Sequence, residues 1–402
     1  MDKRSHTSLI FPGLAAMLGI IALLGLGSQL PQPPQHNVTV VNIEVPVRVF
    51  DGDRFVDNLT MADFEVFENG VLQKVEAAYL IQKTTVLRNA TIDNGPPSFI
   101  PIIQPDEKVK NRHFLLIFEM DEYLPQLGKA LEYFCSNVLA PNDSLRIITP
   151  ENLWEIKRGP LTEDSRAKMA EDIKSKLRKS LTLSGSELRG LIMNLRISSQ
   201  SMSDGSDPEF TGFIGGRDII ERIVSLKSMN VRQYAQFAKF IKPLDGQKYV
   251  FIFYQKESFV IPSSFKKMFG EIASTRQEVV DNNEIKNLFA DADTTVHFLF
   301  VTKTKTTTND VEYKDSGDAA SVEMSGEFYK AFRNLADATG GISEATANPI
   351  YGFKRALDAT ENFYLVYYKP ANYKVDGKYK EIEVKVKSGQ YRVNHRAGYI
   401  DK

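Results

Sequence analysis

The sequence is almost without cysteine, since Cys135 is the only one among its 402 residues. A single cysteine excludes an intramolecular disulfide, and it also excludes a lipid-modified cysteine at the end of a signal segment. Cys135 follows Phe134 in a stretch with helical periodicity. We therefore expect it to be a small buried core residue rather than a reactive thiol.

An excess of charge is also absent, because 50 Lys and Arg residues oppose 51 Asp and Glu residues and leave a net charge of -1. Proteins that bind nucleic acid usually carry a basic excess, so the balance argues against a nucleic-acid partner. Hydrophobic residues make up 42% and charged residues 25% of the chain, as is typical of a globular protein. The length allows two or three domains.

Local signatures of catalysis are missing as well. The histidines show neither a His-x-x-x-His pair nor a Cys/His metal spacing, and the chain has no Gly-x-Ser-x-Gly turn. The glycines of Gly212 to Gly216 are not followed by the Gly-Lys-Ser/Thr of a phosphate-binding loop. The sequence therefore predicts no catalytic residue and no cofactor, and it predicts a core position for His297. The five histidines are His6, His36, His113, His297 and His395.

The N-terminus carries the clearest local signal. Lys3 and Arg4 precede an uncharged apolar run from Leu9 to Leu30, and a Pro/Gln spacer follows at residues 31–35. A basic start before an apolar run is typical of a secretory signal peptide, but the run is also long enough to remain as a membrane anchor. In both cases the residues after Pro31 are exported, to the periplasm, the cell envelope or the medium. The membrane is touched only if residues 9–30 stay attached.

Residues 36–100 are predicted to form an N-terminal β domain. The valines and isoleucine from Val41 to Val49 alternate with other residues, which is the period of a half-buried strand. Asn69-Gly70 separates two further strand-like runs and favours a tight type I′ hairpin turn. Pro96-Pro97 and residues 104–111 are typical of a linker.

Residues 101–345 alternate between strand-like and helical patterns. The continuous apolar run from Phe114 to Phe118 predicts a central strand that is covered on both faces. Thr162 is a suitable N-cap for the helix that follows it. We expect an α/β fold with a doubly wound, mostly parallel sheet, and surface loops at Ser198 to Gly216 and Thr302 to Ser321. The other expected strands are Asp143 to Ile148, Lys248 to Phe253 and Val296 to Val301.

Residues 346–402 return to β structure after one helix. Phe363 to Tyr368 is a strand-like run, and Ile382, Val384 and Val386 alternate with charged residues. We expect this helix and these strands to pack with the N-terminal β domain, forming a flanking β-sandwich. The α/β unit would then be an insertion between the two ends of the sandwich.

Five blocks of the sequence occur in a recognisable order. They are Leu59 to Gly70, the strand ending in Glu119, Asp245 to Lys248, Leu335 to Gly341, and Phe363 to Tyr368 with Asp376 to Lys378 and Arg396 to Tyr399. In this order they resemble a bacterial family of secreted proteins related to the von Willebrand factor type A domain. The resemblance implies a Rossmann-like type A domain, which is usually an adhesion or assembly module. Many such domains hold Mg²⁺ through Asp-x-Ser-x-Ser after the first strand, a Thr from a second loop and an Asp from a third.

The residues that match this metal site depart from the family pattern. Glu119, Asp121 and Tyr123 stand where the Asp-x-Ser-x-Ser residues belong, and Ser186 is the candidate for the second loop. The third position holds Gln255 and Lys256, which offer no carboxylate. We therefore expect a vestigial site without a metal. The alternative is a rebuilt Mg²⁺ site made of Glu119, Asp121 and Glu122, since carboxylates are the ligands this ion prefers.

The N-terminal run predicts an extracytoplasmic protein, and the family resemblance implies a non-catalytic interaction module of the adhesion type. Its partner is an unidentified protein, and the contact residues are Glu119, Asp121, Glu122 and Tyr123, because open α/β sheets usually bind at the C-terminal edge of the sheet. Two other hypotheses remain open. The protein is either a structural component of the cell envelope without a ligand, or a metal-dependent enzyme.

Overall fold

A computed structural model describes most of the chain from residue 41 onward. The signal or anchor segment 1–35, the linker prolines Pro96-Pro97 and Lys256 lie outside the described residues. Contacts group Val41–Lys402 into one unit. Among the described residues, no helix is both long and apolar enough to cross a membrane. The described residues are 41–83, 85–89, 111–156, 161–205, 209–228, 231–255, 258–276, 282–302, 319–324 and 326–401.

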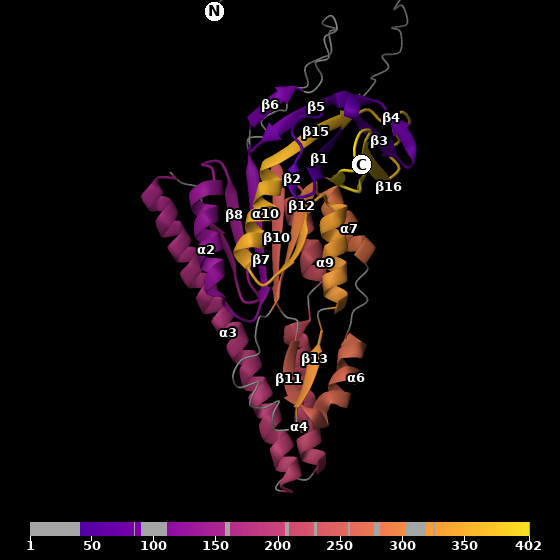
Figure 1. Cartoon of the computed structure of the whole chain (residues 1–402). Helices are drawn as coiled ribbons and strands as arrows, with labels where there is room; N and C mark the ends of the chain where they lie inside the picture. The colour runs from indigo at the N-terminus through magenta and orange to yellow at the C-terminus, as the bar shows by residue number, and fades with distance from the viewer. Residues whose placement is uncertain are drawn as a thin grey trace, which may run out of the picture. The chain divides into compact units, whose positions relative to one another are not determined.

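A six-stranded mixed sheet lies at the centre of this unit (Figure 1). Its first five strands pair in parallel, and the last strand, β9, pairs antiparallel with β8. The strand expected at Phe114 to Phe118 is present, and each of these five residues is buried. In sheet order the strands are β14 (Ser343–Thr346), β12 (Thr294–Val301), β10 (Gln247–Gln255), β7 (Arg112–Met120), β8 (Ser144–Ile148) and β9 (Leu153–Ile156).

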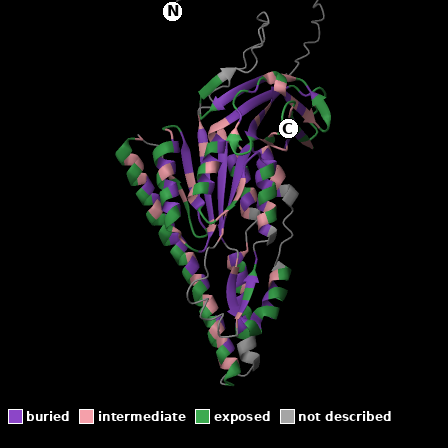
Figure 2. Cartoon of the chain, in the orientation of Figure 1, coloured by how far each residue is buried: buried purple, intermediate pink, exposed green. Residues whose placement is uncertain are grey.

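Helices cover both faces of the mixed sheet because its strands are apolar on both sides. Phe114 and Phe118 belong to one core cluster, while Leu115 and Ile117 belong to another on the opposite face. Figure 2 shows the buried strands between these helices. Cys135 lies in the first cluster and is fully buried, as expected. The first face is covered by α2 (Pro125–Tyr133), the first half of α3 (Glu163–Ser203) and α10 (Pro349–Glu361), and the second by α5 (Val231–Ile241), α7 (Asn282–Asp291) and α9 (Gly326–Ala338).

Strands from the two ends of the chain form two antiparallel sheets. Val45 pairs with Val366 in one sheet, and Val66 pairs with Val384 in the other. Asn69 and Gly70 adopt positive φ angles of 48° and 78°, as the predicted tight turn requires. The first sheet runs β17 (Arg392–His395), β1 (Ile43–Asp51), β15 (Asn362–Tyr368), β5 (Val75–Gln82), β6 (Thr85–Asn89), with β2 (Arg54–Phe55) beside β1; the second runs β18 (Gly398–Ile400), β16 (Tyr379–Val386), β3 (Phe64–Glu68), β4 (Val71–Gln73).

A helical segment with its own core follows α3. The side chain of Thr162 accepts a hydrogen bond from the Ser165 backbone N–H at 3.2 Å, so the predicted N-cap is present. The helix then continues for 41 residues and packs against α4. The loop expected at Ser198 to Gly216 is wrong for most of its length, because α3 ends at Ser203 and α4 begins at Glu209. The segment contains α4 (Glu209–Lys227), α6 (Lys266–Arg276) and the antiparallel pair β11 (Ser258–Pro262) and β13 (Ala319–Glu323).

The expectation of a doubly wound, mostly parallel α/β fold is wrong. Among the described strands, three of the four sheets are antiparallel and the fourth is mixed. Hydrophobic periodicity predicts where strands lie but not the direction in which they pair. The turn between β8 and β9 shows how direction is decided: the Thr149 N–H donates to the Asn152 carbonyl at 2.8 Å. So short a connection can only join antiparallel neighbours.

Candidate functional site

The acidic residues of the predicted vestigial metal site lie together where β7 ends, and a cation from a side chain already occupies this position. Asp121 is buried, with only 8% of its surface exposed. Its Oδ2 atom accepts a hydrogen bond from Lys227 Nζ at 2.5 Å. Lys227 is the last residue of α4, and its side chain is 1% exposed. A fixed ammonium therefore neutralises the Asp121 carboxylate.

The Lys227 ammonium has an aromatic neighbour as well. It lies 5.0 Å from the centroid of the Phe259 ring, which belongs to β11. The face of an aromatic ring attracts a cation, and the attraction grows when water is excluded. The ammonium is thus held between a carboxylate from the mixed sheet and a ring from the helical segment.

Glu119 and Tyr234 form a second contact at this edge. The Tyr234 hydroxyl donates to Glu119 Oε1 at 3.3 Å. Burial, followed by the nearby Glu119 carboxylate, raises the pKa of Tyr234 well above its usual value. The phenol therefore stays protonated at neutral pH and remains a hydrogen-bond donor to Glu119.

The other predicted residues lie in the loop after β7 and in α3. The Arg178 guanidinium of α3 lies 5.0 Å above the ring of Tyr123, and Glu122 is exposed. Ser186 lies inside α3 rather than in a loop, and it is exposed. Gly185, the residue before Ser186, allows α3 to lie close to the end of β7. An added Cβ at Gly185 would lie 2.1 Å from the Asp121 carbonyl oxygen.

Within the part of the chain that the structure describes, no group of three or more His, Cys, Asp or Glu side chains is placed to hold a metal ion. The structure thus brings Glu119, Asp121, Glu122 and Tyr123 to one strand end and leaves Ser186 on the neighbouring helix. The arrangement supports a fixed ion pair and a phenol–carboxylate hydrogen bond. In the ion pair and in the hydrogen bond alike, the polar atoms that the structure describes are directed at each other rather than at solvent.

Lys227 is the residue that the sequence analysis missed. A signal for it was available, since Ile220, Ile223, Val224 and Lys227 recur at helical spacing and all four are buried. A lysine on the apolar face of a helix needs a partner for its charge. The identity of that partner could not be derived, because Asp121 lies 106 residues earlier in the chain.

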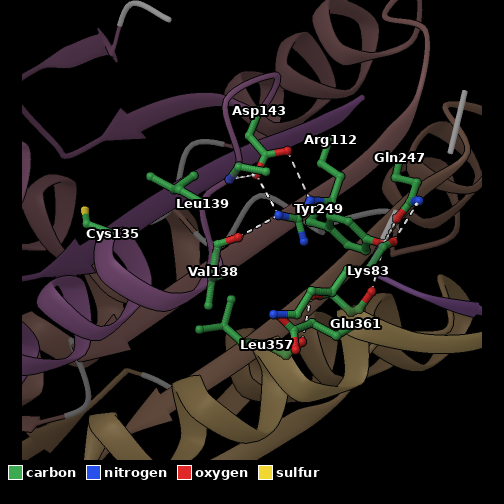
Figure 3. Close-up of polar contacts among 12 residues, drawn as sticks. Lys83, Arg112, Cys135, Val138, Leu139, Asp143, Gln247, Tyr249, Leu357 and Glu361 are labelled. Atoms are coloured by element: carbon green, nitrogen blue, oxygen red, sulfur yellow. Dashed lines mark hydrogen bonds and ion pairs between the residues drawn. The ribbon is translucent and has the colours of Figure 1, made fainter. Parts of the chain in front are cut away.

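A second polar cluster lies at the opposite end of the mixed sheet (Figure 3). Arg112 donates to both carboxylate oxygens of Asp143, at 3.1 Å and 2.7 Å, and to the Val138 carbonyl at 2.6 Å. Tyr249 donates to the Thr360 carbonyl at 3.1 Å. These contacts tie the starts of β7 and β10 to neighbouring segments, so we assign them a structural role.

His297 is buried and His395 is half-buried, and each accepts a hydrogen bond on one ring nitrogen. The Ile342 N–H donates to His297 Nδ1 at 3.3 Å, and the Val384 N–H donates to His395 Nε2 at 3.2 Å. Each accepting nitrogen therefore carries no proton. Burial lowers the pKa of His395, and it lowers the pKa of His297 well below its usual value with a further contribution from Arg48. His297 is thus a core residue, as expected, rather than a base.

His297 predicts a loss of stability in mild acid. Below a pH of about 6.5 the unfolded chain protonates this imidazole and the folded chain does not, so unfolding takes up a proton. The free energy of unfolding should therefore fall by about 1.4 kcal/mol per pH unit through His297. Urea unfolding of the wild type and of His297→Gln, between about pH 7 and pH 5, measures the effect.

The difference in free energy of unfolding between the wild type and His297→Gln reports on His297 alone, since the other titrating groups are common to both proteins. Glutamine can still accept the hydrogen bond from the Ile342 N–H. The variant should show the shallower dependence on pH. If the free energy of unfolding changed equally with pH in both proteins, the assignment of a neutral, buried His297 would be contradicted.

Comparison with known proteins adds no family. No model of a protein family matches the chain. No curated protein matches it either. The resemblance to von Willebrand factor type A-related proteins thus stays a prediction that depends on the residues quoted above.

Proposed function

We propose that this chain is an extracytoplasmic interaction module that binds a protein partner through the outward face of α3. The apolar run from Leu9 to Leu30 behind Lys3 and Arg4 supports export. The resemblance to a family whose members are usually adhesion or assembly modules supports an interaction role. Neither of these observations locates the contact surface; the exposed residues of α3 do.

The outward face of α3 carries a stripe of apolar and small residues. Leu183, Met193 and Ile197 are 56%, 54% and 49% exposed, and Ser186 and Gly190 lie between them. The spacing of these five residues is three, four, three and four, which places them on one side of a helix. We call these five residues the α3 stripe. Two small residues at its centre allow a partner to approach the backbone closely.

Basic residues surround the α3 stripe. From Lys174 to Ser203 the only acidic residue is Glu187, and its carboxylate is bonded to Arg222 of α4 at 2.6 Å. Lys179 and Arg189 are exposed, while Lys174 and Lys176 are paired with Glu171 and Asp172 just before the segment. The matching partner surface is therefore apolar at its centre and acidic at its rim, because complementary charge steers association and selects the partner. The basic residues of this segment are Lys174, Lys176, Arg178, Lys179, Arg189 and Arg196.

The ion pair at the end of β7 is consistent with a contact on α3 rather than on the acidic rim. The buried Asp121 carboxylate is already neutralised by Lys227. The first half of the α3 stripe lies beside this position, since Gly185 approaches the Asp121 carbonyl and Ser186 of the stripe is the next residue. Of the contact residues expected from the sequence, Glu122 is exposed and Tyr123 is half-buried beneath Arg178 of α3.

Gly190→Glu tests this surface. An added Cβ at Gly190 meets no heavy atom within 4 Å, so the substitution leaves the fold unstrained. It places a carboxylate in the middle of the stripe, against an apolar and acidic partner. We expect cross-linking capture of the partner by the full chain, from a native envelope extract, to fall about tenfold, as loss of central contacts does at other interfaces.

Gly270→Glu is the matched control. Gly270 lies in α6, is exposed, and also has open space around an added Cβ. This variant should capture the same protein as the wild type, and thermal melting should show both variants folded. Equal capture by all three proteins would place the contact surface elsewhere. If no protein is captured by the wild type, the interaction role itself is wrong.

A further inference from the structure

Two large apolar side chains are exposed next to each other in the hairpin of β3 and β4. Val71 and Leu72 follow the Asn69-Gly70 turn and are 57% and 59% exposed. β4 is the last strand of its sheet, so its second edge has no neighbour among the described strands (Figure 1). Single apolar residues on a surface are ordinary, but a group of them marks a contact site.

Val71 and Leu72 project from opposite sides of β4, because successive side chains of a strand alternate. Val71 lies opposite Glu68, and Leu72 lies opposite the half-buried Phe67. The ammonium of Lys385 is 4.8 Å from the centroid of the Phe67 ring. A flat protein surface covers only one side of such a hairpin. A lipid layer surrounds the inserted end and covers both sides at once.

The loop between β15 and β16, residues 369–378, adds a third apolar side chain and an excess of positive charge. The backbone N–H of Ala371 donates to the side chain of Gln73 in β4 at 2.9 Å, which holds the loop beside this strand. Val375 is 64% exposed. The loop contains three lysines and one aspartate, so it attracts anionic headgroups. The lysines are Lys369, Lys374 and Lys378, and all three are exposed.

The apolar N-terminal run ends within reach of this hairpin. Ten residues separate Leu30 from Val41, and they span at most about 40 Å at about 3.3–3.6 Å per residue. Ile43 pairs with Tyr368 of β15, which pairs in turn with Val75 of β5. Neighbouring strands lie about 5 Å apart, so Val75 is about 10 Å from Ile43. β4 ends only two residues before Val75.

We infer that the β4 end, defined as Val71, Leu72 and the loop of residues 369–378, inserts into the headgroup region of the bilayer that holds residues 9–30. The apolar side chains enter the interface, and the lysines contact anionic headgroups. The inference rests on export with a retained anchor, as in the proposed function, but not on the α3 stripe. The β4 end and the α3 stripe share no residue, so separate experiments test them.

A polarity-sensitive dye on Leu72→Cys tests the inserted position. Cys135 is buried, and burial raises the pKa of its thiol to about 12, so the dye reacts only with the new cysteine. The full chain is reconstituted in vesicles of phosphatidylcholine and phosphatidylglycerol. We expect the emission to shift to the blue, and quenchers carried by the lipids should place the dye about 5–10 Å below the surface.

Leu153→Cys is the matched control, because Leu153 is also 59% exposed and also lies in the last strand of a sheet, β9. A dye at this position should report water in the same vesicles. The inference is overturned if the dye at position 72 reports water in the reconstituted chain. It is also overturned if lipid-borne quenchers act equally at both positions.

The double variant Lys374→Glu/Lys378→Glu tests the lysines in the dye-labelled Leu72→Cys protein. We expect the equilibrium to shift at least about tenfold towards the withdrawn β4 end, since each lysine near an anionic surface contributes about a factor of five. Lys266→Glu/Lys267→Glu reverses two exposed charges on α6 and should leave the dye signal unchanged. An equal response to both double variants overturns the contact between the loop and the headgroups.

The intact mass of the protein isolated from native membranes tests the tether itself. We expect a mass that includes residues 9–30. A mature protein without them would overturn the tethered contact, whereas capture of a partner through the α3 stripe would be unaffected. Failure of this inference is therefore distinguishable from failure of the proposed interaction surface.

Discussion

Replacing Lys227 with methionine is expected to lower the free energy of unfolding by about 3–5 kcal/mol, the usual cost of removing one partner of a buried ion pair. The Lys227 side chain is 1% exposed and the Asp121 side chain 9%. Without the ammonium, the carboxylate is left in a site that excludes water. A domain is usually stable by only about 5–15 kcal/mol, so this single change removes a large part of the total.

Two further variants test whether the lost stability comes from the buried ion pair. Lys239→Met removes another lysine from the last turn of a helix, but Lys239 is exposed, so the loss should stay below about 1 kcal/mol. The double variant Lys227→Met/Asp121→Leu replaces both charges by apolar groups and should recover most of the lost stability. Urea unfolding measures all three. A loss below about 1 kcal/mol in Lys227→Met would show that the ion pair is not buried as described.

Replacing either of two glycines of α3 with alanine should change the free energy of unfolding, but in opposite directions. An alanine Cβ at Gly185 would lie 2.1 Å from the Asp121 carbonyl oxygen, a backbone atom that cannot rotate away. Gly185→Ala should therefore lower the free energy of unfolding by about 3 kcal/mol through overpacking. Gly190 has open space around it, so Gly190→Ala should raise the free energy of unfolding. The expected gain is about 1 kcal/mol, the helix propensity of alanine over glycine.

The pair is informative because both sites lie in one helix, five residues apart, and gain the same methyl group. Differences in helix propensity therefore cancel, and the comparison reports the distance between α3 and the end of β7. Melting temperatures and urea midpoints of the two variants give the result. A stabilising Gly185→Ala would mean that α3 does not touch Asp121.

The positions of most strands could be predicted from the sequence, but their directions could not. The apolar run from Phe114 to Phe118 and the alternation at Ile382, Val384 and Val386 both mark strands that the structure contains. Periodicity is the same for parallel and antiparallel neighbours when both faces are covered. The antiparallel pairing of β8 with β9, and of β11 with β13, depends on how the chain returns.

The same limit applies to the candidate site. Glu119, Asp121, Glu122 and Tyr123 are adjacent in sequence, so their common place at a strand end could be predicted. Lys227 and Tyr234 meet them only because α4 and α5 pack at this edge. The polar composition of Ser198 to Gly216 predicts a loop, yet most of its described residues are helical.

The sequence by itself determined the local features of this protein: the apolar N-terminal run, the Thr162 N-cap, the Asn69-Gly70 turn and the buried faces of its strands. Each of these depends on residues that are neighbours in the chain. Only the tertiary structure decided the direction of the strands, the ion pair between Asp121 and Lys227, and the position of the 369–378 loop beside β4. These depend on contacts between distant segments, whose free energy is realised only when the whole chain has packed.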